Sequence, residues 1–257
     1  YEIRRSLVGS DMCIRGSPSS ARKLWLDRLK AEEFQVIIVT PPCNSWSRLV
    51  WLNNFGPKPC RSRNHPRGFP WADKGSVSRR HAEEGNIWVD FLIAVLVIVR
   101  DLNNDRRFTL VLAEHPEDLG FSEDIRPASI WQLLDLRESA AGWCGTCAIY
   151  QCLHCSHEEL VHRDFAKPTR FVSNSKAVLA LGHAGWPTLS ASGAYQGPLP
   201  STCGHRHNGS LVRKRDDSAF RSSGSSLSQN FWTRSSHTRC TRPVSYPPLT
   251  PPTTTNE

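Results

Sequence analysis

Cys43 is the residue from which a chemical interpretation of this sequence starts. The apolar and β-branched run at residues 36–40 predicts a buried strand, and Pro41 and Pro42 end it because neither has an N–H to give to a sheet. The strand therefore delivers the thiol of Cys43 to its carboxyl end, the edge at which open α/β sheets bind ligands. A cysteine at such a position is either an inert packing residue or a nucleophile, and the other reactive residues decide between the two.

Two further sites could meet Cys43 at this edge. Glu114 follows the second predicted strand, residues 106–113, while Lys167 and Arg170 lie at an end of the fourth, residues 167–174. In a parallel sheet these sites could share one edge. A thiol, a carboxylate and cations that converge in one place form the pattern of an active site.

Helices alternate with these strands along the chain. An amphipathic helix is predicted for residues 18–33, a strongly apolar one for 84–103 and a third for 125–137. The helix at 84–103 is apolar almost all round, so it should be covered on most sides. A short third strand is predicted at 145–152. The alternation predicts an α/β fold with a mostly parallel sheet and helices on both faces.

Composition narrows the choice of partners. The chain has 257 residues, a net charge of +8 and nine cysteines. Half of that charge, +4, lies in residues 213–257, so basic charge permits nucleic-acid binding without demanding it. Nine cysteines without a signal peptide favour a reducing, intracellular compartment, with the nucleus among the options. The longest apolar run, residues 91–99, is too short to span a membrane, so no membrane partner is expected.

Residues 48–80 are predicted to form a long polar connection rich in Pro and Gly. Basic residues in it lie among the aromatic residues Phe55, Phe69 and Trp71. Cations beside aromatic rings suit phosphates and stacked bases, whereas the plainer interpretation is a solvated lid. The sequence leaves both interpretations open.

Several of these segments together resemble the DNA cytosine-5 methyltransferase family. Residues 40–47, Thr-Pro-Pro-Cys-Asn-Ser-Trp-Ser, look like its Pro-Cys nucleophile loop, and Glu114-His115-Pro116 looks like its Glu-Asn-Val segment. Residues 166–171, Ala-Lys-Pro-Thr-Arg-Phe, occupy the place of its Gln-x-Arg-x-Arg segment. The residues of these segments are similar to those of a divergent branch of the family that is carried by phages, mobile elements and some protists. The resemblance covers residues 18–212 and implies a Rossmann-like methyltransferase sheet.

The resemblance also implies a mechanism and a set of site residues. The thiolate of Cys43 would add to C6 of a flipped cytosine, and the methyl group would then pass from S-adenosylmethionine to C5. Glu114 would hold the N3/N4 edge of the base, and Arg170 would complete the catalytic set by contacting the nucleotide. The implied partner is DNA, with Ser45, Ser47, Arg48, Lys167 and Thr169 on the substrate side and Pro41 and Asn86 on the cofactor side.

The sequence departs from the family pattern at its start. A Gly-rich turn after a first strand should precede residue 18, and an acidic residue should follow the next strand, yet neither is present. We therefore expect a sheet that is incomplete at its N-terminus, an incomplete S-adenosylmethionine pocket and a fragment that is inactive alone. The domain interpretation is a leader or adaptor-derived artefact at 1–17, a partial catalytic domain at 18–212 and a disordered Ser/Arg/Thr/Pro-rich tail at 213–257.

Two rival interpretations come from other residues. Cys144 with Cys147, and Cys152 with Cys155, form two Cys-x-x-Cys pairs of the kind that bind zinc. Only four residues separate the pairs and a strand is predicted between them, so a single four-thiolate site is geometrically awkward and no metal site is assigned. A zinc-stapled nucleic-acid-binding module is the first rival, and a decayed mobile-element remnant without catalysis is the second. The oligomeric state stays open.

Overall fold

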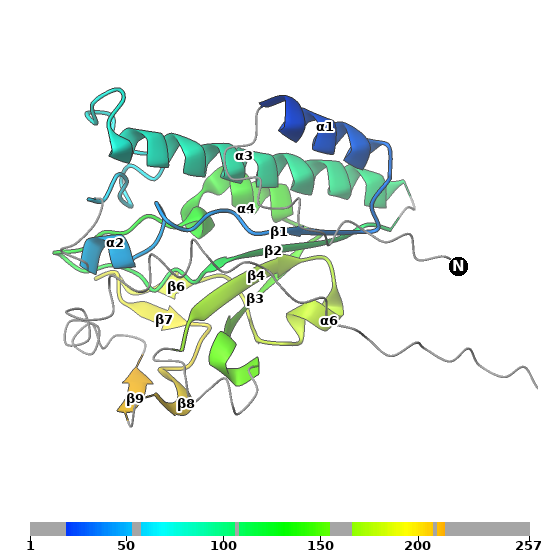
Figure 1. Cartoon of the computed structure of the whole chain (residues 1–257). Helices are drawn as coiled ribbons and strands as arrows, with labels where there is room; N and C mark the ends of the chain where they lie inside the picture. The colour runs from blue at the N-terminus through cyan, green and yellow to red at the C-terminus, as the bar shows by residue number, and fades with distance from the viewer. Residues whose placement is uncertain (1–18, 53–57, 106–107, 155–165, 208–209, 214–257) are drawn as a thin grey trace, which may run out of the picture.

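The computed structural model describes residues 19–52, 58–105, 108–154, 166–207 and 210–213 (Figure 1). The interpretation of residues 1–17 as a leader falls outside the described residues, and so does that of residues 213–257 as a tail, except for Arg213, which ends β9. In chain order the elements are α1 Ser19–Lys30, β1 Val36–Val39, α2 Leu49–Leu52, α3 Val77–Asn104, β2 Leu110–Pro116, η2 Ile130–Gln132, α4 Leu134–Ala140, β3 Gly145–Tyr150, η3 Gln151–His154, β4 Pro168–Ser173, α6 Lys176–Leu179, β5 His183–Ala184, β6 Thr188–Leu189, β7 Tyr195–Gly197, β8 Thr202–His207 and β9 Ser210–Arg213.

A five-stranded mixed sheet forms the centre of the molecule, in the order β1-β2-β4-β3-β5. β1 and β2 are parallel, whereas β4 runs antiparallel to both of its neighbours and β5 runs antiparallel to β3. The prediction of a mostly parallel sheet is therefore wrong, since β1 with β2 is the one parallel pair among the described strands of this sheet. The reversal of β4 has a consequence for the site, because the start of β4 lies beside the end of β2. A parallel β4 would have begun at the opposite edge.

The helix α3 supplies the main apolar surface over one face of the sheet, with α1 and α4 packed against it (Figure 1). It begins at Val77 rather than at Glu84, and the side chain of Ser76 caps it by accepting a hydrogen bond from the Arg79 amide. Its C-terminal half is covered on most sides as expected, because no residue from 91 to 100 is exposed, whereas Ile87 in the N-terminal half is 39% exposed. The fully buried residues form a stripe that recurs at intervals of three and four residues and consists of Ala82, Gly85, Val89, Leu92, Val95, Leu96 and Val99. No helix among the described residues is long and apolar enough to cross a lipid bilayer.

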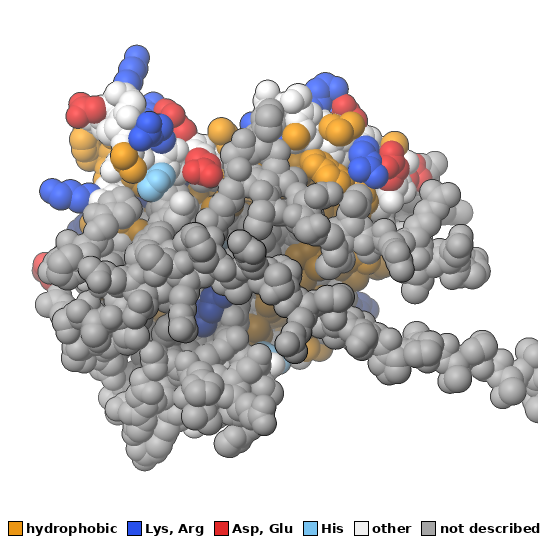
Figure 2. Space-filling view, in the orientation of Figure 1, with side chains coloured by type: hydrophobic (Ala, Val, Ile, Leu, Met, Phe, Trp, Pro, Cys, Tyr) orange, Lys and Arg blue, Asp and Glu red, His pale blue; other side chains and the backbone are white. Residues whose placement is uncertain are grey.

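The opposite face of the sheet is open over β1. Val36 and Ile38 point away from the helix layer and are 56% and 52% exposed, whereas Val39 faces the helices and is buried. Figure 2 shows hydrophobic side chains at the surface at the level where β1 and β2 lie in Figure 1. In the described part of the chain, the expected second layer of helices therefore does not reach β1.

Short elements fill the stretch 177–212. β6 pairs with β7 and β8 with β9, both antiparallel. Tyr195 and Leu199 pack with Ala148 and Tyr150 of β3 in a second hydrophobic cluster. Tyr150 lies opposite Pro168 in the sheet register, so this cluster supports the end of the sheet at which β4 begins.

Candidate functional site

The thiol of Cys43 lies on a short turn that follows β1, residues 43–46, which we name the Cys43 turn. Cys43 is exposed, and the turn closes through a hydrogen bond from the Trp46 amide to the Cys43 carbonyl oxygen at 3.0 Å. The amide of Ser45 also donates to the side-chain oxygen of Asn44 at 2.9 Å. The strand therefore ends where the two prolines predict, and the cysteine side chain reaches solvent.

Glu114 lies beside the start of the connection that leads to the Cys43 turn. Val39 of β1 pairs with Ala113 of β2, and because the two strands are parallel, the following residues Thr40 and Glu114 are neighbours. β2 runs to Pro116, so Glu114 is inside the strand and not after it as the sequence predicts. Burial raises the pKa of the Glu114 carboxyl above its usual value, and the positive charge of Lys167 opposes that rise. A half-buried carboxyl of this kind keeps its proton to a higher pH than a solvated one.

Lys167 is the cation that the structure brings to Glu114. It is exposed, it immediately precedes β4, and its φ of +42° is unusual for a residue with a side chain. The hydroxyl of Thr169 donates to the Lys167 carbonyl oxygen at 3.2 Å, and Thr169 is itself fully buried. The edge of the sheet at which β1 and β2 end therefore has a half-buried carboxyl near an exposed lysine, and the connection that leads to the exposed Cys43 starts beside that carboxyl.

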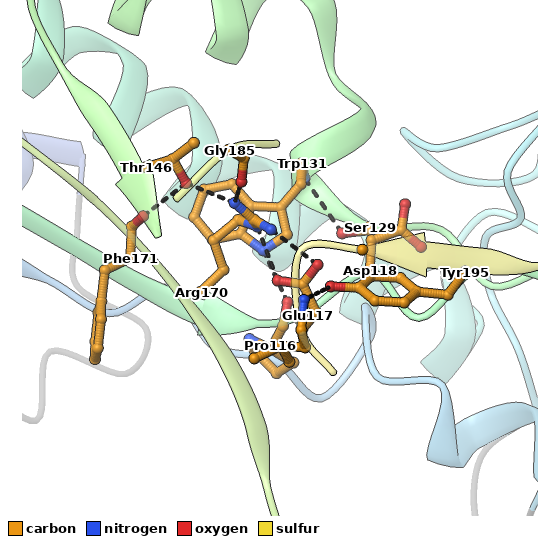
Figure 3. Close-up of polar contacts among 12 residues, drawn as sticks. Pro116, Glu117, Asp118, Ser129, Trp131, Thr146, Arg170, Phe171, Gly185 and Tyr195 are labelled. Atoms are coloured by element: carbon orange, nitrogen blue, oxygen red, sulfur yellow. Dashed lines mark hydrogen bonds and ion pairs between the residues drawn. The ribbon is translucent and has the colours of Figure 1, made fainter. Parts of the chain in front are cut away.

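Arg170 points to the opposite face of the sheet from Glu114. In the register of β2 and β4, Glu114 pairs with Phe171 and His115 with Arg170, and side chains of successive strand residues alternate between faces. The Arg170 side chain is fully buried, and its Nε and Nη2 contact the two carboxylate oxygens of Glu117 at 2.8 and 3.0 Å (Figure 3). The predicted catalytic set is thus divided, with Glu114 on one face and Arg170 on the other.

Glu117 and Tyr195 complete the buried cluster around Arg170. Nη1 of Arg170 donates to the Thr146 hydroxyl at 2.8 Å and to the Gly185 carbonyl oxygen, so its fork of donors is shared among three segments. Burial raises the pKa of Glu117 while the charge of Arg170 lowers it, and the Tyr195 hydroxyl hydrogen-bonds to the same carboxylate. The sequence analysis did not single out Glu117 or Tyr195. The signal available for Glu117 was its place in an acidic run directly after β2.

The remaining residues assigned to substrate make contacts within the chain. The Ser47 hydroxyl accepts a hydrogen bond from the Leu49 amide at 3.2 Å at the start of α2. Nη1 of Arg48 donates to the carbonyl oxygens of Leu119 and Gly120 at 3.3 and 2.9 Å. The Ser45 side chain is buried. These residues therefore hold the Cys43 turn in place, and their predicted contacts with substrate stay predictions.

The two residues assigned to the methyl donor do not fit it as they stand. Pro41 is buried. The side-chain oxygen of Asn86 accepts from Arg61 at 3.0 Å, and its amide nitrogen donates to the Arg67 carbonyl oxygen at 2.7 Å. Both polar atoms of Asn86 are thus already used to hold the loop ahead of α3, and neither is directed at a ligand.

The aromatic residues of that loop stack on one another, next to cations that are paired with acids. The rings of Phe69 and Trp71 are stacked with centroids 4.9 Å apart, and Trp71 is 67% exposed. Arg67 forms ion pairs with Asp90 and Asp135, both at 2.6 Å. The pairing favours a lid held by ion pairs over a free phosphate-binding surface, while Phe55 lies outside the described residues.

The cysteines of the two Cys-x-x-Cys pairs are separated in the fold. Cys144 packs against the main core, which raises the pKa of its thiol to about 12, whereas Cys152 belongs to the second hydrophobic cluster. Cys147 is buried and its sulfur donates to the Val178 carbonyl oxygen at 3.5 Å. In the part of the chain that the structure describes, no three His, Cys, Asp or Glu side chains are grouped to hold a metal ion. Cys155 falls outside that part.

Comparisons with known proteins identify no relative of this chain. Family models, curated proteins and solved structures were each searched, and none matches. Any functional conclusion therefore depends on the residues at the rim of the sheet.

Proposed function

We propose that this chain carries the base-side half of a DNA cytosine-5 methyltransferase-like site on a Rossmann-like sheet. The observation that carries the proposal is the parallel pairing of β1 with β2, which sets the connection to the exposed thiol of Cys43 next to Glu114. The family resemblance of the segments at 40–47 and 114–116 supports the same assignment. The substrate class is a cytosine base in DNA.

The chemistry follows from the two side chains. The thiolate of Cys43 forms a C–S bond to C6 of cytosine, and the electron pair of the C5–C6 double bond moves into the ring toward N3. Glu114, whose pKa burial raises, donates a hydrogen bond or its proton to N3 and so stabilises the charge that develops there. C5 then has enamine character and reacts with an electrophile. In the methyltransferase family that electrophile is the methyl group of S-adenosylmethionine.

The proposal stops at the covalent adduct, because the residues assigned to the methyl donor do not fit it. The adduct has a consequence that needs no methyl donor. Water protonates C5, the original C5 hydrogen leaves as a proton, and elimination of the thiolate restores the double bond. The net result is exchange of the C5 hydrogen of cytosine with solvent.

The test is release of tritium from duplex DNA that contains 5-tritiated cytosine, measured with the full chain. The wild-type chain should release tritium, and Cys43→Ser should reduce the rate on the order of a thousandfold. Cys144→Ser is the matched control, because the pKa of that thiol, about 12, keeps it protonated at neutral pH, and it should leave the rate unchanged. No release by the wild type, or full release by Cys43→Ser, would exclude the proposal.

A further inference from the structure

Arg61 is a buried guanidinium group close to the Cys43 turn. It is 1% exposed, and it donates to the carbonyl oxygens of Pro66 and Ala82, both at 2.7 Å, and to the Asn86 side chain. Burial lowers its pKa to about 10, and its neighbour Cys60 hydrogen-bonds to it. A buried charge is costly, so a guanidinium held mainly by neutral groups needs a reason to be there.

The Cys43 turn rests on this guanidinium through Trp46. The Arg61 Cζ atom lies 3.6 Å from the centroid of the Trp46 ring, and Trp46 is 3% exposed. At this distance the planar group stacks on the ring and attracts it by a cation–π interaction. Because the Trp46 amide donates to the Cys43 carbonyl oxygen, the anchored ring and the reactive residue belong to one closed turn.

Gly85 of α3 lets the turn approach the helix. A Cβ atom at position 85 would lie 2.6 Å from the Ser45 Oγ, 2.9 Å from the Trp46 Nε1 and 2.9 Å from the Arg61 Nη2. Glycine is a poor residue for a helix interior, so its place here is explained by this close contact. The Ser45 Oγ, Trp46 Nε1 and Arg61 Nε atoms are shut off from solvent and have no hydrogen-bond partner in the structure.

We propose that Arg61 is a positioning residue for Cys43. Stacked on Trp46 and bonded to the start of α3, it holds one side of the Cys43 turn, and the contacts of Arg48 with Leu119 and Gly120 hold the other side. The thiol is thereby presented between two fixed supports. This inference concerns the site of the proposed function, but the geometry that it describes exists without any substrate.

The test compares two variants that disturb the contacts of Arg61 and Gly85 with the Cys43 turn against a matched control. Arg61→Lys keeps the charge and loses the planar stack, while Gly85→Ala improves α3 as a helix and pushes its new methyl group into the turn. Arg137→Lys is the control, because Arg137 also lies over a tryptophan ring, 4.9 Å from the centroid of Trp186, away from the Cys43 turn.

The first readout is amide hydrogen exchange of the free protein. The Trp46 amide should exchange roughly tenfold faster or more in Arg61→Lys and in Gly85→Ala, while the β2 amides keep their wild-type rates. In Arg137→Lys the Trp46 amide should exchange at the wild-type rate. Uniform loosening of the whole chain, or an unchanged Trp46 amide in Arg61→Lys, would overturn the inference.

The second readout is the tritium-release assay. Arg61→Lys should lower the turnover number about tenfold and leave the KM for DNA unchanged, because the thiol is misplaced and the DNA contacts are not. An equal loss in Arg137→Lys would overturn the positioning role. Absence of release by the wild type would count against the proposed function alone, since the amide measurement decides the role of Arg61 independently.

Discussion

Glu114 and Glu117 lie three residues apart on one stretch of chain, and each meets a cation from the start of β4. Glu114 is half-buried and meets Lys167, which is exposed. Glu117 is fully buried as a side chain and meets Arg170 through two contacts of 2.8 and 3.0 Å. Burial raises the pKa of both carboxyl groups, so the difference between them lies in the partner.

The comparison separates a carboxyl that can react from one that holds the fold. The guanidinium of Arg170 lies against both oxygens of Glu117, with one hydrogen bond and one ion-pair contact, and Tyr195 also hydrogen-bonds to this carboxylate, so it has little left to offer a substrate. Lys167 is a single exposed charge that only moderates the pKa of Glu114. Two acid–cation pairs at the adjoining ends of β2 and β4 therefore serve different purposes, because Glu114 and Arg170 project from opposite faces of the sheet, one partly exposed and the other buried.

The largest expected effect comes from breaking the buried pair of Arg170 and Glu117. Arg170→Met leaves Glu117 buried without a counter-charge and should lower the free energy of unfolding by about 3–5 kcal/mol. Lys167→Met removes a cation of the same segment from an exposed position and should change it by less than about 0.5 kcal/mol. Urea unfolding of both variants gives the two values. Adding Glu117→Gln to Arg170→Met should restore part of the loss, and equal losses in the two single variants would erase the distinction.

His115 tests whether the face that holds Arg170 is dry. Burial, together with the nearby charge of Arg61, lowers the pKa of His115 to about 3 from an ordinary value of 6.5. Between these values the unfolded chain binds a proton that the folded chain does not, so this residue costs stability as the pH falls below 6.5. The slope approaches about 1.4 kcal/mol per pH unit.

His115→Phe should remove that contribution. The buried histidine ring packs edge-on against Trp131, with ring centroids 6.1 Å apart, so a phenyl ring can take its place. Urea unfolding at about pH 7 and about pH 5 should give a smaller difference in the variant than in the wild type. The same difference in both proteins would mean that water reaches His115 and that this face is not dry.

The sequence predicts those features of the structure that depend on neighbouring residues, and it does not predict those that depend on pairing between distant segments. The apolar run before Pro41 gives β1 and the exposed turn after it, because strand period and the missing proline N–H are local properties. The direction of β4 is not local, and a parallel strand would have put Lys167 at the far edge of the sheet. The face of Arg170 depends on its register with His115, which the sequence does not contain. Arg61 was counted among the basic residues of a polar loop, and its burial was missed because arginine is seldom buried.

The smallest expected effect is a change in the pKa of Glu114 that Glu117 should not share. Lys167 lowers the pKa of Glu114 against the larger effect of burial, so Lys167→Met should raise that pKa further. For an acid whose folded pKa lies above its unfolded value, stability is highest below the unfolded pKa and declines as the pH rises through the folded one. The variant should therefore lose slightly more stability than the wild type on going from acid to neutral pH. Carboxyl chemical shifts of Glu114 followed by NMR over a pH titration report the change directly, and the shifts of Glu117 are the internal control. A parallel rise at Glu117 would mean that Lys167 acts on both faces of the sheet and that the two pairs are electrostatically one site.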